Sequence, residues 1–288
     1  MPNSPDAHKE ENTYVIDTES GAEIARLIHQ ARLVTRSMGG VFSQQMALSH
    51  VHDVLDIGCG PGGWVLDVAY THPDMHVVGT DISESMIEYA RTTAKVQGRQ
   101  NAQFRVMNFL EPLDFPNASF DFVNSRFTTF ITRTAWSSLL QECLRILRPG
   151  GMIRFTTSDN FGMTNSVALE TFNDLFAKAA KLAGYGFSPH AHSIGITPML
   201  ARFLLDAGFQ NIQHEVNALN YSIGMADYEP WHLDVVTSLK LVQPYFIRLG
   251  LSSQEEIDQL YEQFLVESAS DDFCGLWYIL SAWGEKPS

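Results

Sequence analysis

The chain has 288 residues, of which 45% are hydrophobic and 18% charged, so it is long enough to bury a sizeable core in one large or two small domains. Its formal net charge is −14, and a chain this acidic has no general electrostatic footprint for nucleic acid or for an anionic membrane. The 3 cysteines are far apart, without the paired spacing of a zinc site, which indicates a reducing compartment. No apolar run reaches transmembrane length and residues 1–13 are polar, so we expect a cytoplasmic protein with a disordered amino-terminal tail.

The first predicted element is an amphipathic helix over residues 19–38, where apolar residues recur at helical spacing. A short buried strand is predicted at 53–57, and it runs into the glycine-rich turn GCGPGG at 58–63 and then a helix from residue 64. Glycine has no Cβ, so backbone at such a turn can approach a ligand closely. The strand, turn and helix together predict a ligand site.

The glycine turn has two interpretations as a ligand site, beside an ordinary turn that binds nothing. Gly58, Gly60 and Gly63 satisfy the dinucleotide fingerprint, with Asp81 placed about 20 residues further on, as expected for a ribose-binding acid. Asp56, however, stands two residues before the first glycine, where a carboxylate would oppose a pyrophosphate. An acid there suits a ligand that carries positive charge.

Four more strands follow in chain order, each separated from the next by a helix or a loop, at 76–80, 103–107, 120–124 and 152–156. Strands that alternate with helices predict an α/β fold with a doubly wound parallel sheet. The later part of the chain is predicted to add helices at 165–182 and 198–207 and strands at 212–220 and 275–283.

Four motifs in this order resemble the class I S-adenosylmethionine-dependent methyltransferases of the small-molecule type. They are D-x-G-x-G-x-G at 56–62, the acid Asp81 after the second strand, SFDFV at 119–123 and LRPGG at 147–151. The resemblance covers roughly residues 50–220 and the last strand. It implies a mostly parallel seven-stranded sheet with an antiparallel last strand, and S-adenosyl-L-methionine as the cofactor.

The resemblance also implies which residues hold the cofactor. Asp56 would complement its cationic groups, Asp81 would accept hydrogen bonds from its ribose diol, and Asn108, in place of the family's commoner aspartate, would face its adenine. Tyr14 and Arg36 would reach its carboxylate, although a surface salt bridge explains Arg36 equally well. The expected cofactor-binding set is Tyr14, Arg36, Asp56, Gly58, Cys59, Gly60, Asp81, Ile82, Met86, Asn108, Phe109 and Ser125.

Three segments, 14–40, 159–196 and 221–270, are extra to the minimal sheet. In small-molecule members of the family such insertions form a lid, which we expect to exclude water and orient the acceptor. The predicted organisation is therefore a tail at 1–13 and a single methyltransferase domain at 14–288, with its core at about 41–158, 197–220 and 271–288.

His190 and His192 are the candidate general bases, because they lie two apart in a loop bounded by glycine and proline. Each alone is also explained as a loop or packing histidine. Only Asp159 stands near them as a third ligand, so no metal site is predicted. The expected acceptor pocket consists of Arg126, Phe127, Tyr185 and Trp231.

The sequence thus predicts a methyltransferase that moves a methyl group to an O, N or C atom of a small, partly apolar molecule by direct displacement. Three alternatives stay open: an enzyme of secondary metabolism that binds adenosylmethionine without transferring methyl, a nicotinamide-dependent oxidoreductase, and a non-catalytic binding protein. The expected partner is a small-molecule acceptor, with no nucleic acid and no membrane, and a homodimer is left open.

Overall fold

One mixed sheet of eight strands carries the fold, in the order β3-β2-β1-β4-β5-β8, with β6 and β7 also paired to β8. The computed structural model describes residues 13–43, 46 and 48–288, so the predicted disordered tail lies outside the described residues except for Thr13. The strands are β1 (Asp53–Ile57), β2 (His76–Asp81), β3 (Ala102–Val106), β4 (Phe120–Arg126), β5 (Leu147–Thr157), β6 (Met163–Thr164), β7 (Gln210–Asn220) and β8 (Gly275–Glu285).

The strands from β3 to β5 are parallel, and β8 runs antiparallel to both β5 and β7. The predicted α/β fold with a mostly parallel sheet and an antiparallel last strand is confirmed. The sheet has one strand more than expected because the two-residue β6 pairs with the start of β8.

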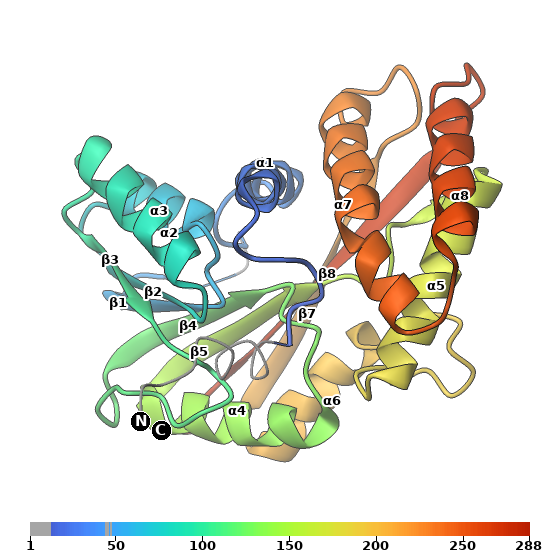
Figure 1. Ribbon diagram of the computed structural model, residues 1–288. Coiled ribbons are helices and arrows are strands. Elements are labelled where there is room, and N and C mark those ends of the chain that lie inside the picture. The colour runs from blue at the N-terminus through green and yellow to red at the C-terminus, as the bar shows by residue number, and fades with distance from the viewer. Residues whose placement is uncertain (1–12, 44–45, 47) are drawn as a thin grey trace, which may run out of the picture.

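Helices cover both faces of the sheet (Figure 1). Core side chains of α2 and α3 pack on one face and those of α4 and α6 on the other. A further cluster joins α5, α7, α8 and part of α1 to the β7–β8 side of the sheet. The helices are α1 (Gly21–Ser37), α2 (Gly63–Thr71), α3 (Glu84–Val96), α4 (Arg133–Ile146), α5 (Val167–Leu182), α6 (Thr197–Ala207), α7 (Tyr228–Arg248) and α8 (Gln254–Ser268).

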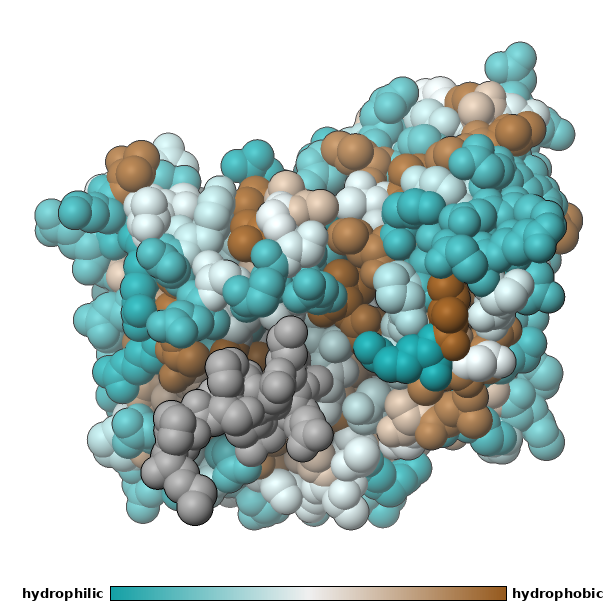
Figure 2. Space-filling view, in the orientation of Figure 1, coloured by the Kyte–Doolittle hydropathy of each residue, from teal (hydrophilic) through white to brown (hydrophobic). Residues whose placement is uncertain are grey.

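The centre of the sheet explains the continuous apolar run of β1. Val54, Leu55 and Ile57 are fully buried, because helices cover a parallel strand on both faces. The chain order reverses between β1 and β4, which are direct neighbours in register Ile57 to Ser125. Ligands of open α/β sheets bind at the carboxyl ends of strands beside such a reversal. Figure 2 shows a mostly hydrophilic surface with a hollow beside α7 where hydrophobic residues gather.

Element boundaries differ most from the sequence expectation at β5. The predicted strand begins at residue 152, whereas β5 begins at Leu147 and includes the LRPGG motif. Leu147 pairs with Phe120, and the register then shifts before Phe122 pairs with Met152. Proline and glycine are read from sequence as strand breakers, and here they lie in an irregular stretch that still belongs to the ladder.

Candidate cofactor and acceptor site

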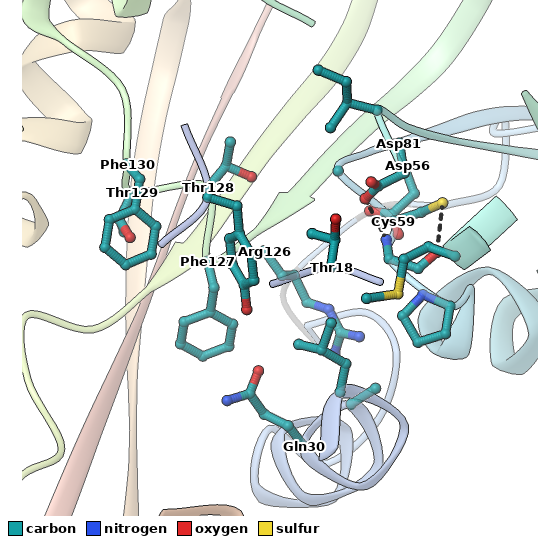
Figure 3. Close-up of a pocket in the computed structure, with 18 of the residues that line it drawn as sticks. Thr18, Gln30, Asp56, Cys59, Asp81, Arg126, Phe127, Thr128, Thr129 and Phe130 are labelled. Carbon is teal, nitrogen blue, oxygen red and sulfur yellow. Dashed lines mark hydrogen bonds between the residues drawn. The ribbon is translucent and has the colours of Figure 1, made fainter. Parts of the chain in front are cut away.

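A pocket opens at the carboxyl ends of β1, β2 and β4 (Figure 3). Its empty space is about 1070 Å³, counting the mouth that is open to solvent. One wall is the glycine turn with Asp56 and Asp81, and α1 and residues 126–131 supply the others. The glycine turn and its two acids therefore face α1 and the segment after β4 across one pocket.

The glycine turn is shaped by backbone that favours glycine. Gly58 has φ of +67° and Gly62 has φ of +83°, in the left-handed region that other residues rarely adopt. A Cβ added at Gly58 would lie 3.4 Å from Thr128 Oγ1 at the pocket wall, and one at Gly62 would lie 2.7 Å from the ring of Phe104. The turn thus brings bare backbone against both the pocket and the core, as close binding of a cofactor requires.

Asp81 ends β2 and faces the pocket with both carboxylate oxygens oriented by backbone amides. Gly60 N donates to Oδ2 at 2.8 Å and Ser83 N donates to Oδ1 at 3.0 Å. Burial raises the pKa of Asp81, and these backbone donors oppose the rise. Each oxygen of an ionised carboxylate can accept a second hydrogen bond. Asp81 is therefore suited to hold a diol such as that of a ribose.

Asp56 lies in a row of polar side chains that crosses three strands in register, from Asp56 to Asn124 to Arg154. Asn124 Nδ2 donates to Asp56 Oδ1 at 2.6 Å, and Arg154 Nε donates to Asn124 Oδ1 at 2.8 Å. Arg154 is fully buried, and its guanidinium carbon lies 5.5–5.8 Å from the ring centroids of Phe42, Trp64 and Phe122. The row fixes the orientation of Asp56 at the pocket.

Burial also changes the acidity of this row. It raises the pKa of Asp56 to about 6, and the nearby Arg126, the amide of Asn124 and the charge of Arg154 oppose the rise. The pKa of Arg154 falls to about 9 through burial and the like charge of Arg126. At neutral pH Asp56 is thus an ionised carboxylate near two cations, Arg126 in the pocket lining and Arg154 in the core behind it. Sequence reasoning missed Asn124 and Arg154, although polar residues inside apolar strands were a signal for them.

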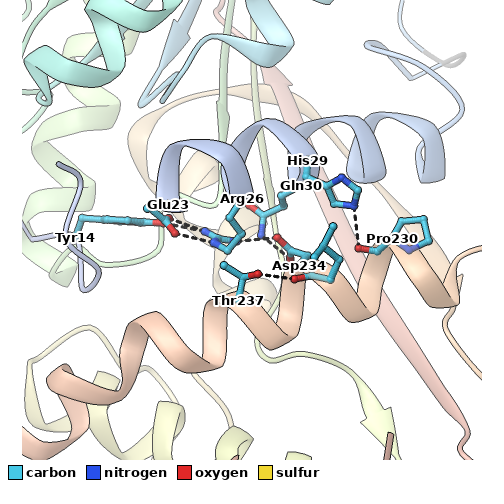
Figure 4. A network of polar contacts seen from close by, with 9 residues as sticks. Tyr14, Glu23, Arg26, His29, Gln30, Pro230, Asp234 and Thr237 are labelled. Carbon is cyan, nitrogen blue, oxygen red and sulfur yellow. Dashed lines mark hydrogen bonds and ion pairs between the residues drawn. The ribbon is translucent and has the colours of Figure 1, made fainter. Parts of the chain in front are cut away.

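A second buried polar network joins α1 to α7 (Figure 4). Tyr14 Oη donates to Glu23 Oε1 at 2.6 Å, and Arg26 donates to both oxygens of Glu23 at 2.7 and 2.8 Å and to Asp234 Oδ1 at 2.9 Å. Gln30 Nε2 donates to Asp234 Oδ2 at 3.2 Å. Tyr14 and Gln30 both line the pocket, so the network connects the pocket wall to the packing of the two helices.

The structure brings nine of the twelve expected cofactor residues together. Tyr14, Asp56, Asp81 and their neighbours line the pocket, whereas Arg36, Asn108 and Ser125 do not. Arg36 pairs with Asp227 at 2.5 Å near the end of α1. Asn108 Oδ1 accepts from Leu110 N at 3.0 Å beside the pocket residue Phe109, and Ser125 Oγ donates to Ile57 O at 2.9 Å. The pocket residues among the expected set are Tyr14, Asp56, Gly58, Cys59, Gly60, Asp81, Ile82, Met86 and Phe109.

Two of the four expected acceptor residues line the pocket, Arg126 and Phe127. Arg126 Nη1 donates to Thr35 Oγ1 at 3.1 Å, and Phe127 stacks on Trp277 with ring centroids 5.8 Å apart. Trp231 is instead buried in a stack on Tyr221 at 3.6 Å.

Tyr185 lies behind the pocket wall, edge-on to Phe130 with ring centroids 6.3 Å apart. The wall residues that sequence reasoning missed include Gln30, Thr128 and Phe130. They come from a helix face and from the irregular segment after β4, neither of which carries a motif.

The expected bases His190 and His192 lie on an exposed loop outside the pocket lining. Their ring centroids are 6.0 Å apart. Within residues 13–43, 46 and 48–288, no group of three or more His, Cys, Asp or Glu side chains is placed to hold a metal ion. Across the same residues, no helix is both long and apolar enough to cross a bilayer.

The sequence and the fold are similar to those of known methyltransferases. Residues 54–151 match the family model described as a methyltransferase domain. The chain is 34% identical over 101 residues to the demethylmenaquinone methyltransferase of Lactococcus lactis, a match that covers 35% of this chain and 39% of the relative. It is 29% identical over 172 residues to the enzyme of the same name from Listeria welshimeri. This match covers 56% of this chain and 72% of the relative. Residues 54–151 therefore carry a methyltransferase domain of the class I S-adenosylmethionine-dependent kind.

Solved structures share the methyltransferase fold at lower identity. The YcgJ protein of Bacillus subtilis aligns with a TM-score of 0.53 at 18% identity, over 90% of this methyltransferase and 99% of that chain. Phosphoethanolamine N-methyltransferase 2 of Haemonchus contortus aligns with a TM-score of 0.55 at 20% identity. The alignment covers 100% of this chain and 61% of that chain. S-adenosyl-L-methionine is the cofactor of the family, and the nicotinamide interpretation of the glycine turn is set aside.

Replacing Asp81 by alanine in this methyltransferase is expected to weaken S-adenosylmethionine binding by about 1–3 kcal/mol, because charge-assisted hydrogen bonds to the ribose are lost. Isothermal titration calorimetry measures the change directly. Asp74→Ala is the matched control, since Asp74 is an exposed acid in the loop before β2. Equal affinities of the Asp81 and Asp74 variants would remove Asp81 from the cofactor site.

The affinity for S-adenosylmethionine is expected to fall about tenfold for each pH unit below the pKa of Asp56, which is about 6. The Asp56 carboxylate, which would complement the cofactor's positive charge, is present above this pKa and is lost as the pH falls through it. Calorimetry between pH 8 and 5 tests this, with Asp56→Asn as the variant expected to lose the dependence. S-adenosylhomocysteine, which lacks the sulfonium, separates the contribution of the ammonium group.

Proposed function

We propose that the protein transfers the methyl group of S-adenosylmethionine to an O, N or C atom of a small, partly apolar acceptor by direct displacement. The observation that carries this proposal is that one pocket holds both a cofactor cradle and an apolar wall. The cradle consists of the glycine turn, Asp56 and Asp81, and the apolar wall includes Phe127 and Phe130. Figure 3 shows these two parts on opposite sides of the pocket, with Arg126 between them.

The residues of this chain would contribute alignment and the exclusion of water. The cofactor supplies an activated methyl group when bound, so displacement needs little covalent help from the protein. Asp81 would hold the ribose, Asp56 would face the cationic end, and Phe109, Ile82 and Met86 would pack on the remaining surface. The exposed positions of His190 and His192 offer no support for a base at the acceptor, and the acceptor's proton would leave to solvent.

A lid over the acceptor is part of the same proposal. Segments 14–40, 159–196 and 221–270 would belong to the single domain and cover the carboxyl ends of the strands. The support is that α1 lines the pocket and packs on α7 through the buried Arg26 network. Closing such a lid would exclude water from the displacement.

The acceptor would be a small molecule rather than nucleic acid, given a net charge of −14. The names of the relatives support an acceptor of the demethylmenaquinone kind as the first to test. The three described cysteines form no disulfide, which supports a reducing compartment such as the cytoplasm. The proposal covers both a monomer and a homodimer.

The test is transfer of labelled methyl from S-adenosylmethionine to a panel of ring-containing acceptors, with the label counted in the organic extract. Gly60→Arg is the negative control, because the bulky side chain would fill the cofactor cradle. Transfer by the natural chain and not by the control is expected. Cofactor binding without transfer to any acceptor of the panel would favour an adenosylmethionine-binding enzyme of another reaction class.

A further inference from the structure

We propose that Gln30 is a specificity residue that presents its side-chain carbonyl to the acceptor, so that the site selects acceptors with an O–H or N–H group. The inference rests on the proposed methyl transfer and names the substrate class within it. Gln30 lies on α1 and lines the pocket. In Figure 3 it lies on the side of the pocket near Phe127 and away from Asp81.

The orientation of the Gln30 amide follows from its partner. Nε2 donates to Asp234 Oδ2 at 3.2 Å, and an ionised carboxylate can only accept hydrogen bonds. Turning the amide over would place Oε1 against a carboxylate oxygen, with two acceptors and no proton between them. Asp234 therefore holds the nitrogen of Gln30 and leaves the carbonyl oxygen for the pocket.

Asp234 is itself fixed by the Arg26 network. It is 1% exposed and accepts from Arg26 Nη1 at 2.9 Å, and Arg26 makes two further hydrogen bonds to Glu23. Glu23, Arg26 and Gln30 are spaced by three and four residues, so they share one face of α1. Figure 4 shows this face directed at Asp234 on α7. The amide is thus oriented by a chain of buried charges before any ligand binds.

The chemistry of the pocket near Gln30 suits a ring that carries a hydrogen-bond donor. Phe127 and Phe130 offer aromatic surface, and Gln30 Oε1 offers an acceptor atom beside them. In the reaction the lone pair of the acceptor's oxygen or nitrogen forms a bond to the methyl carbon, and the pair of the broken C–S bond stays on sulfur. The proton of the O–H or N–H group leaves to solvent. A site built to bond a donor discriminates strongly against an analogue that lacks it, because its own polar group is left unpaired.

The test uses 1-naphthol and its methyl ether, 1-methoxynaphthalene, which lacks the O–H donor and carries one methyl group more. Their binding to the full chain is measured by calorimetry in the presence of saturating S-adenosylhomocysteine. For the natural chain we expect 1-naphthol to bind about tenfold more tightly than its methyl ether. In Gln30→Leu and Gln30→Met we expect this difference to disappear through weaker binding of 1-naphthol.

The controls separate the inference from the proposed function. Unchanged affinity for S-adenosylhomocysteine in both Gln30 variants shows that the cofactor site is intact. Equal binding of the two naphthalenes to the natural chain, binding of neither, or an unchanged preference in the variants would each overturn the role of Gln30. Failure of the natural chain to bind S-adenosylhomocysteine would instead contradict the proposed function.

Discussion

Replacing Arg26 by methionine is expected to destabilise the folded protein by about 3–5 kcal/mol, because it leaves buried charges without their partner. Arg26 is 6% exposed, and the carboxylates that it bridges, Glu23 and Asp234, are 0% and 1% exposed. Without the guanidinium these two carboxylates share an apolar interface between α1 and α7. Urea unfolding followed by circular dichroism measures the loss.

The loss in Arg26→Met should depend on pH. Two unpaired buried carboxylates bind protons more tightly in the folded than in the unfolded chain. Protonation therefore favours the folded state, and the destabilisation should shrink as the pH falls from 7 toward 5. Arg36→Met is the matched control on the same helix, since Arg36 is 56% exposed in its pair with Asp227 and such pairs contribute about 0–1 kcal/mol. Equal losses in the two variants would mean that the buried network does not hold α1 to α7.

Replacing Arg154 by methionine is expected to cost roughly 1–3 kcal/mol of stability, because one buried acceptor loses its donor and a second keeps only the donor Trp64 Nε1. These acceptors are Asn124 Oδ1 and Val41 O, which Arg154 contacts at 2.8 and 2.9 Å. Arg154 Nη1 is buried without a hydrogen-bond partner among the described residues. Its desolvation reduces the net stability that the other hydrogen bonds of Arg154 provide. The larger consequence is expected at the cofactor site, since the cation at the end of the polar row is removed.

The same substitution should raise the pKa of Asp56 above its present value of about 6, because one of the charges that favour the carboxylate is gone. We therefore expect the pH midpoint of S-adenosylmethionine binding to move up by about one unit, which is about tenfold in affinity at a pH below both midpoints. Calorimetry across pH gives the midpoint. Arg154→Lys keeps a charge and should retain the original midpoint, and a common midpoint for both variants would contradict the role of the row.

The pocket wall formed by the glycine turn, Asp56 and Asp81, which is the proposed cofactor cradle, was the more predictable part from sequence. Asp56, the glycines and Asp81 lie within or directly after short apolar strands, and their roles depend on local geometry. Parallel strands align their carboxyl ends, so a motif on β1 and an acid after β2 must meet. Asn124 and Arg154 were harder to predict, because they lie beside Asp56 only through the register of three separate strands.

The proposed acceptor side of the pocket depends on contacts between distant segments. Gln30 and Asp234 are 204 residues apart, and nothing local to either residue indicates the other. Aromatic side chains were also poor indicators of the pocket, since Trp231 on α7 is buried against Tyr221 and Phe273, while Phe130 lines the wall. An aromatic ring buries the same apolar surface in the core and at a pocket wall, so sequence alone does not separate the two.

The position of β8 has a consequence for how the chain reaches this fold. β8 is translated after every other strand, yet it lies between β5 and β7 and pairs with both. Until Gly275–Glu285 has emerged from the ribosome, β5 and β7 each lack the strand that pairs with them. Unpaired strand edges are templates for aggregation. Folding during synthesis should therefore wait on one late segment, and ribosome-stalled chains ending before residue 275 should depend on chaperones to remain dispersed.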